Sequence, residues 1–172
     1  MLRATIICGS ADDNGVTARM CETAKSSLEG KGYDVSLFRP SEMNIGHCRD
    51  CDGCIKGTCV IEDDMSLIYQ SFSESDLLVL SSPIHFSGPS SIIKTVMDRF
   101  QPYWCKGMEH PDYCIALLCG GSKQPNFEIT EKIIRAFCLT TRMEYRGSLQ
   151  IPDTDSGIDD VGDRVERFLL VW

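Results

Sequence analysis

The apolar and polar residues of this chain fall into blocks that alternate between the spacing of a strand and the spacing of a helix. Short runs with strand character occupy residues 2–8, 33–38, 77–81, 113–119 and 142–151. Segments with helical periodicity or helix-start signals follow them, at residues 17–29, 64–73, 90–100, 127–139 and 157–171. The pattern therefore predicts five strands that alternate with five helices.

Strands that alternate with helices form a parallel sheet, because each helix carries the chain back to the start of the next strand. The apolar strands indicate burial on both faces. We therefore predict an α/β three-layer sandwich in which helices cover both faces of a five-stranded parallel sheet, in the flavodoxin-like order 2-1-3-4-5. In this order ligands bind beyond the carboxyl ends of the first and third strands. That rule selects the loops at residues 9–17 and 82–88.

The fourth helical segment along the chain also has a predicted buried side. For residues 127–139 the helical spacing places Ile129, Ile133, Ile134 and Phe137 together on one side.

Length and composition fit a single domain that spans residues 1–172. Hydrophobic residues make up 42% of the chain and charged residues 24%, as in ordinary globular proteins. The formal net charge of −8 argues against nucleic-acid binding, which needs a basic surface. No apolar run approaches the roughly 18 residues of a membrane span, and no secretory signal is visible. We therefore expect a cytoplasmic protein with no nucleic-acid or membrane partner.

Four of the ten cysteines lie close together in a cysteine-rich loop at residues 45–62. Their spacing is Cys48-x2-Cys51-x2-Cys54-x4-Cys59, and the charged residues and glycines between them are not typical of core packing. Four thiolates at such spacing can hold one 4Fe-4S cluster. Two alternatives remain open, a zinc site and a metal-free thiol cluster. Zinc ribbons, however, separate their two Cys-x2-Cys pairs by about 15–20 residues.

Other cysteines have a simpler interpretation. Cys8, Cys114 and Cys119 lie within or at the ends of apolar strand-like runs, so we expect them to be small buried hydrophobic residues. Ten cysteines in a chain without an export signal indicate a reducing compartment.

The loop after the first strand has the residues of a phosphate site. Ser10, Asn14 and Thr17 supply donors, and Gly15 lets the backbone turn close to a ligand. The helix that begins near Val16 presents free N–H groups and a positive dipole end, which suit a phosphate. The loop lacks the Gly-Lys-Ser/Thr end of an ATP-binding loop, and it is not a dinucleotide fingerprint.

The loops after the third and fourth strands are suited to a planar ring. The third strand ends in Ser82-Pro83-Ile84-His85-Phe86, and the fourth is followed by Gly120-Gly121. We expect His85 and Phe86 to lie near the ring. His85 is the candidate catalytic residue, and an ordinary loop histidine is the alternative.

These motifs together resemble a known family. Residues Ser10–Thr17, Cys48–Met65, Ser82–Phe86 and Asp98–Arg99 are similar to the NADPH-dependent FMN reductases of the flavodoxin-like superfamily, and the cysteine run resembles the iron–sulfur flavoproteins within it. The resemblance implies non-covalent FMN, and a homodimer or homotetramer in which the cluster of one subunit lies close to the flavin of another. The expected FMN contacts are Ser10, Asn14, Gly15, Val16, Thr17, Ser82, Pro83, Ile84, His85, Phe86, Gly120 and Gly121.

Three functions are compatible with the sequence. The first is an FMN-dependent oxidoreductase that passes electrons between the Cys48–Cys59 cluster and FMN to a small-molecule acceptor, with a ferredoxin-like protein as a candidate donor. The second is a cluster-free reductase in which NAD(P)H reduces FMN, which then reduces a quinone, a flavin or a similar acceptor. The third is a thiol- or metal-based redox sensor. The sequence does not identify the donor or the acceptor.

Overall fold

A computed structural model describes all 172 residues. Five parallel strands form the central sheet in the order β2-β1-β3-β5-β6. This is the predicted order 2-1-3-4-5 when the strands are counted along the chain. The bounds are β1 (Arg3–Cys8), β2 (Asp34–Phe38), β3 (Leu77–His85), β5 (Tyr113–Cys119) and β6 (Glu144–Ile151).

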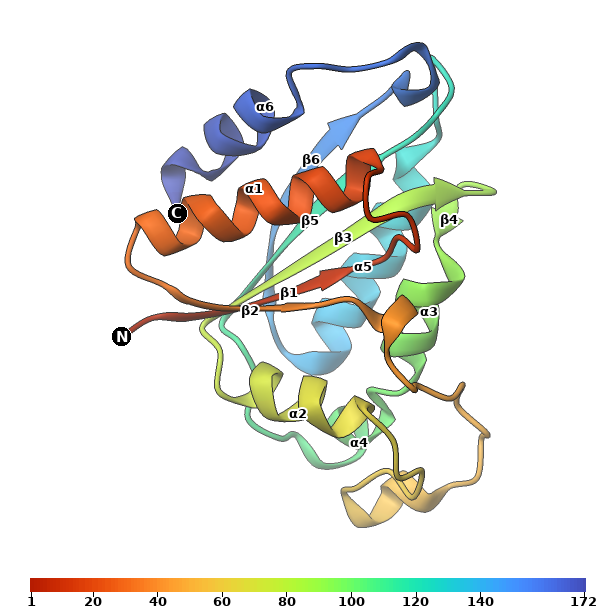
Figure 1. Cartoon of the computed structure of the whole chain (residues 1–172). Coiled ribbons are helices and arrows are strands. Elements are labelled where there is room, and N and C mark those ends of the chain that lie inside the picture. Colours follow the sequence, from red (N-terminus) through yellow and green to blue (C-terminus); the bar gives the residue numbers. More distant parts are fainter.

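Helices cover both faces of the sheet and make three layers (Figure 1). Helices α1 (Val16–Gly30) and α6 (Val161–Phe168) lie on one face. The other face carries α2 (Met65–Ser73), α3 (Ser91–Asp98), α4 (Gln101–Lys106) and α5 (Phe127–Thr141). No helix combines the length and the apolar character that crossing a membrane requires.

Each face of the sheet has its own hydrophobic core, because successive side chains of a strand point to opposite faces. In β3, Leu78 and Leu80 pack toward α2–α5, whereas Leu77 and Val79 pack toward α1 and α6. The expected core cysteines Cys8, Cys114 and Cys119 are all buried, which confirms their prediction as small hydrophobic residues. Apolar burial on both sides therefore explains the near-continuous apolar strands.

The sequence pattern missed two short elements. Strand β4 (Gly88–Pro89) pairs antiparallel with the end of β3, so the sheet has six strands rather than five. Helix α4 follows α3 after only two residues, Arg99 and Phe100, and has only six residues itself. The predicted face of α5 was partly wrong: Ile134 and Phe137 are buried, but Ile129 is 45% exposed and Thr130 takes the inward position.

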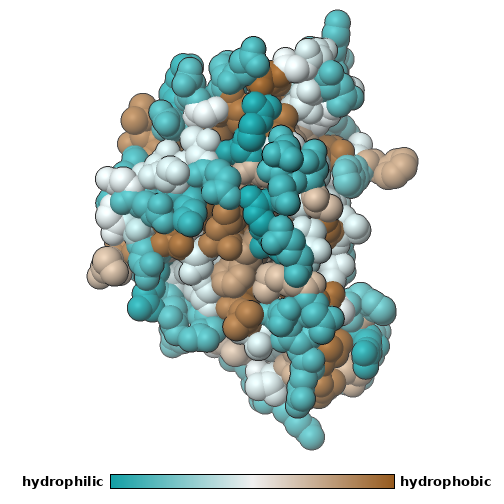
Figure 2. Space-filling view, viewed as in Figure 1, coloured by the Kyte–Doolittle hydropathy of each residue, from teal (hydrophilic) through white to brown (hydrophobic).

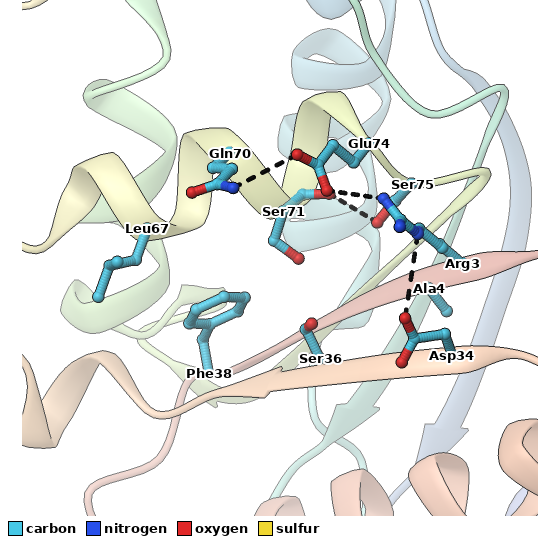
Figure 3. A pocket seen from close by; sticks show the side chains of 10 residues that line it. All are labelled: Arg3, Ala4, Asp34, Ser36, Phe38, Leu67, Gln70, Ser71, Glu74 and Ser75. Atoms are coloured by element: carbon cyan, nitrogen blue, oxygen red, sulfur yellow. Dashed lines mark hydrogen bonds and ion pairs between the residues drawn. The ribbon is translucent and has the colours of Figure 1, made fainter.

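A shallow groove of about 300 Å³ runs between β2 and α2 at the edge of the sheet (Figure 3). Arg3 closes one end, where its guanidinium pairs with Glu74 at 2.7 Å and with Asp34 at 3.9 Å. These charges satisfy one another, and the groove lies away from the carboxyl ends of the strands. The groove is therefore not the candidate site.

Candidate cofactor site and cysteine loop

The loops after β1, β3 and β5 meet at the carboxyl edge of the sheet, as the strand order predicts. The strand register places Cys8 beside Ser81 and Pro83 beside Cys119. Gly9 is hydrogen-bonded on both sides of its peptide: its N–H donates to Ser81 O at 2.7 Å, and its carbonyl accepts from Ser90 Oγ at 2.7 Å. The three loops thus form one continuous surface at the switch point of the strand order.

The start of α1 has unbonded donors. The N–H groups of Val16, Thr17 and Ala18 donate no hydrogen bond within the chain, and the N-cap residue Gly15 has no side-chain cap. These groups point along the helix axis from its positive end. Such an arrangement binds a phosphate. Ala18 was not among the predicted residues, because a backbone donor leaves no trace in the side-chain sequence.

The side chains of the loop after β1 point in different directions, some toward solvent and some back into the chain. Asp13 points outward and pairs with Arg39 at 3.3 Å, whereas the Asp12 carboxylate turns back and accepts the Asn14 N–H at 2.9 Å. Ser10 is half-buried, and Asn14 is exposed. The Thr17 hydroxyl is buried at 3.1 Å from Cys119 Sγ. Thr17 therefore offers a ligand its N–H rather than its hydroxyl.

The β3–β4 turn is the most strained segment of the edge. Phe86 and Ser87 form a two-residue turn with φ of +50° and +63°, values that residues other than glycine rarely adopt. The Phe86 ring is completely exposed, and His85 beside it is also exposed. An apolar ring held in solvent by a strained turn is typical of a contact residue. Both residues can thus reach a bound molecule.

The base of the same hairpin is structural. Ser82 is buried, and its Oγ accepts the Ser90 N–H at 2.9 Å and donates to Pro83 O at 2.8 Å. Pro83 and Ile84 are partly exposed between this anchor and the turn. Ser82 therefore anchors the β3–β4 hairpin. Pro83 and Ile84 are the residues at this end of β3 whose side chains remain accessible to a ligand.

Gly120 is a glycine because its neighbour lies too close for a side chain: a Cβ there would lie 2.4 Å from Pro125 Cβ. At Gly121 a Cβ would lie 2.4 Å from a carboxylate oxygen of Asp155, but that side chain is exposed and can turn away. The backbone of this loop is held by the N–H groups of Thr154 and Asp155, which donate to Gly120 O and Gly121 O, both at 3.2 Å. The loop after β5 is therefore a wall of the site.

The residues at this edge fit a flavin mononucleotide. The free N–H groups at the start of α1 suit its phosphate, and the β3–β4 hairpin and the Gly120–Gly121 loop lie at the same edge of the sheet, where a planar ring would contact them. The distribution of donors near one end and apolar groups near the other matches a cofactor with a charged tail and an aromatic head.

The cysteine loop is closed at its base by a buried ion pair. Arg99 Nη1 lies 2.6 Å from Asp63 Oδ2, and Arg99 Nη2 lies 3.0 Å from Asp63 Oδ1. Arg99 also donates to Gly46 O at 2.7 Å, so it joins the residues before Cys48 to those after Cys59. Burial alone raises the pKa of Asp63, but the hydrogen bonds from Arg99, Gly46 and Met65 outweigh it and lower that pKa overall.

The four predicted ligands are not equally placed. Burial, followed by the neighbouring thiols of Cys105, Cys59 and Cys48, raises the pKa of Cys54. Cys51 is exposed and does not belong to this group. No group of three or more His, Cys, Asp or Glu side chains is positioned to hold a metal ion. The donor set suits an iron–sulfur centre chemically, but the sulfurs would have to draw together to bind one.

Cys105 joins this group through tertiary structure alone. It lies on α4, which packs directly on the turn at residues 53–56 of the cysteine loop, and a Cβ on Gly57 would lie 3.0 Å from Lys106 Cγ. No spacing rule connects Cys105 with the four-cysteine run, so the sequence did not predict it.

Within one chain, the cysteine loop lies apart from the cofactor edge, which is the surface formed by the loops after β1, β3 and β5. Figure 1 shows the loop projecting at the lower right, whereas the hairpin and the loop after β1 lie higher on the same side. The loop also exposes the apolar side chains of Ile55 and Val60, with Trp104 of α4 exposed nearby. Figure 2 shows brown apolar atoms among polar ones at the lower right of this face, as well as at its centre and top.

Comparison with known proteins agrees with this geometry. Residues 2–151 match the NADPH-dependent FMN reductase family. An iron–sulfur flavoprotein of Archaeoglobus fulgidus is 34% identical over 59% of this chain and 47% of its own length, so the match spans about half of that relative. An iron–sulfur flavoprotein of Methanocaldococcus jannaschii is 28% identical over 80% of this chain and 72% of its own length.

Solved structures share the fold. A NAD(P)H:quinone oxidoreductase from Methanothermobacter marburgensis superposes with a TM-score of 0.72 at 15% identity, over 96% of this chain and 94% of that one. A flavone reductase gives a TM-score of 0.72 at 20% identity, over 96% of this chain and 60% of that one. At these identities the likeness shows the flavodoxin-like fold alone. The match over residues 2–151 shows that the chain belongs to the NADPH-dependent FMN reductase family.

Proposed function

We propose that the protein is an FMN-dependent oxidoreductase of the iron–sulfur flavoprotein type, which passes electrons between a four-cysteine cluster and FMN to a small-molecule acceptor. The observation that carries the proposal is the row of unbonded N–H groups at the start of α1, placed where the loops after β1, β3 and β5 meet. FMN supplies one- and two-electron chemistry when bound, and an iron–sulfur centre supplies single electrons.

Each group of residues has its own part in this proposal. Backbone groups of Gly15 to Ala18 hold the phosphate, together with the side chains of Ser10 and Asn14. Pro83, Ile84 and Phe86 orient the ring, and the Gly120–Gly121 wall excludes water from one side of it. His85, exposed at the same edge, is the candidate to hold or deliver a proton for the acceptor.

The ligands of the cluster are proposed to be Cys48, Cys51, Cys54 and Cys59. The proposal is supported by the iron–sulfur flavoprotein relatives and by the ion pair that closes the loop around these residues. NAD(P)H or a ferredoxin-like protein is the proposed electron source. A planar carbonyl compound such as a quinone is a suitable acceptor, because it can stack on the ring at the open edge.

A first experiment tests both cofactors. The protein is purified without oxygen, and its absorption spectrum, iron and sulfide are measured. We expect flavin bands and about four irons per chain. Cys51→Ala should lose the iron, whereas Cys105→Ala, which removes a nearby thiol outside the four-cysteine run, should keep it.

The outcomes separate the candidate functions. Loss of iron in Cys105→Ala but not in Cys51→Ala would replace Cys51 by Cys105 in the ligand set. Protein that contains flavin but no iron would point to a reductase without a cluster. Colourless protein that does not take up added FMN would contradict both oxidoreductase functions.

The second candidate is the cluster-free NAD(P)H-dependent reductase. It is favoured by the exposure of Cys51, which leaves the four sulfurs apart in the folded chain. Steady oxidation of NAD(P)H by iron-free protein, with a quinone or free flavin as acceptor, would support it.

A further inference from the structure

Arg39 lies beside the loop between β1 and α1, where acceptors from three different segments surround its guanidinium. It directly follows β2, and the parallel pairing of β2 with β1 places it next to Cys8. Its Nη2 donates to Glu22 Oε1 of α1 at 2.7 Å, and its Nη1 donates to Asp13 Oδ1 at 3.3 Å and to Cys8 Sγ at 3.9 Å. The side chain is only 17% exposed. Arg39 is therefore anchored on α1, and its fork reaches the loop from there.

The same loop contains two carboxylates close to the donors that a phosphate needs. Asp12 and Asp13 come directly before Asn14 and the N-cap residue Gly15, and no side chain caps α1. The free N–H groups and the dipole at the start of a helix attract a carboxylate as they attract a phosphate. Each of these carboxylates is therefore an internal competitor of the phosphate.

Both carboxylates have partners that keep them away from the start of α1. Asp12 accepts the N–H of Asn14 at 2.9 Å, so the loop itself holds it. Asp13 is held from outside the loop, by Arg39. An isolated exposed ion pair is weak, because both side chains lose freedom when it forms. Arg39 is already fixed by Glu22, so only Asp13 has to be ordered.

We propose that Arg39 is a positioning residue for the FMN phosphate: by holding Asp13 away from the start of α1, it keeps the phosphate site open. The inference rests on the proposed function, because it requires FMN at the cofactor edge. It deepens that function by naming a residue that determines the preference for FMN over riboflavin, which has the same ring and no phosphate. Arg39 acts through Asp13 and does not itself touch the cofactor.

The test is a double-variant cycle of flavin affinity. Whole protein freed of flavin is titrated with FMN and, in parallel, with riboflavin, and flavin fluorescence is measured. Arg39→Gln should lower FMN affinity about three- to tenfold, as expected for a charge at a helix terminus, and leave riboflavin affinity unchanged. Asp13→Ala alone should change neither affinity, because Arg39 already holds that carboxylate away. Added to Arg39→Gln, it should restore FMN affinity.

Arg3→Gln is the matched control. It removes the same charge at the start of β1, from an arginine that pairs with Glu74 at the other end of the sheet, so neither affinity should change. Equal losses for FMN and riboflavin in Arg39→Gln would mean that the whole site is deformed. Additive effects of the Arg39 and Asp13 substitutions would mean that Arg39 acts by its own charge. Either result overturns the proposal, and FMN alone decides the cycle if riboflavin binds too weakly to titrate.

Arg39→Lys carries the test if Arg39→Gln does not fold. Lysine keeps the charge, but it has a single nitrogen and cannot bind Glu22 and Asp13 with two separate donors of a planar fork. FMN affinity should therefore fall here as well, by a smaller factor, and Asp13→Ala should again restore it. Unchanged FMN affinity in Arg39→Lys would then contradict the role of Arg39.

The results also separate this inference from the proposed function. If the unsubstituted protein and Arg39→Gln bind FMN equally well, the role of Arg39 is wrong and the cofactor site stands. If the unsubstituted protein binds neither flavin, the proposed function is wrong, and the role of Arg39 with it.

Discussion

At the residue scale, the strained hairpin turn is the feature that calls most for an explanation. Phe86 and Ser87 both have positive φ, a conformation that costs about 1–2 kcal/mol for a residue with a side chain. Glycine or asparagine would relieve this cost. The chain instead keeps a bulky ring there, and the ring contacts nothing within the chain that shields it from solvent.

The first prediction separates the strain from the ring. Ser87→Gly should raise the free energy of unfolding by up to about 1 kcal/mol and leave FMN affinity unchanged. Phe86→Gly should stabilise the chain by a similar amount but weaken FMN binding, because the ring is lost. Urea unfolding and flavin-fluorescence titration measure the two quantities. Equal FMN affinities in the two variants would show that the ring does not contact the cofactor.

At the scale of elements, the Arg99–Asp63 pair is what joins the cysteine loop to α3. Both side chains are almost fully buried, at 1% and 5% exposure. Breaking a buried pair from one side leaves an uncompensated charge, which typically costs 3–5 kcal/mol. Helix α4 packs on the turn at residues 53–56, so the pair fixes the base of the loop while α4 supports its turn.

The second prediction concerns this pair and its dependence on pH. Asp63→Asn should lower the free energy of unfolding by about 3–5 kcal/mol. Asp98→Asn, which breaks the exposed pair between Lys94 and Asp98, should change it by less than about 1 kcal/mol. Because folding lowers the pKa of Asp63, its stabilisation is present above the unfolded pKa and is lost as the pH falls through the folded pKa.

Urea unfolding midpoints measured from neutral to acidic pH test the predicted direction of this pH dependence. The unsubstituted protein should lose stability on acidification more steeply than Asp63→Asn. Parallel profiles would mean that the charge of Asp63 does not contribute.

At the scale of the whole molecule, the cysteine loop projects away from the loops after β1, β3 and β5 (Figure 1). For the proposed transfer of electrons between a cluster and FMN, a contact between subunits is one way to bring the two together. Exposed Ile55, Val60 and Trp104 give the loop an apolar surface that suits such a contact. This arrangement favours the homodimer or homotetramer expected from the sequence.

The third prediction is that this surface controls association. The double variant Ile55→Ser, Val60→Ser should shift the protein toward the monomer in analytical ultracentrifugation. Leu139→Ser, which removes an even more exposed apolar side chain near the end of α5, should not. A monomer at all concentrations in the unsubstituted protein would refute the subunit contact.

Most of the fold was predictable because the signals are local. Apolar runs bounded by glycine and proline predicted the five parallel strands, and the expected order was that of the flavodoxin-like arrangement. The elements and the side chain that were predicted wrongly also have local causes. Helix α4 has only six residues, and strand β4 has only two, so neither has a clear periodicity. Ile129 was placed on the wrong side because the buried stripe of α5 runs through Thr130, a polar residue that hydrogen-bonds to Ser87 O.

For the candidate site, the position of the loops was predictable, but the direction of their side chains was not. The loops at the sheet edge follow from strand order, since the carboxyl ends of neighbouring parallel strands lie together. What each side chain does there was not visible. Thr17 turns inward to Cys119, and Ser82 anchors the hairpin, because burial and hydrogen bonding decide side-chain direction.

The sequence by itself determined the strands of the sheet, the loop between the first strand and the first helix, and the set of four closely spaced thiols, because periodicity and spacing are properties of neighbouring residues. Only the tertiary structure decided that Arg99 closes the cysteine loop and that Cys105 lies beside Cys54. The tertiary structure alone also keeps the loop apart from the cofactor edge. Such relations join residues distant in sequence, and packing rather than local pattern brings them together.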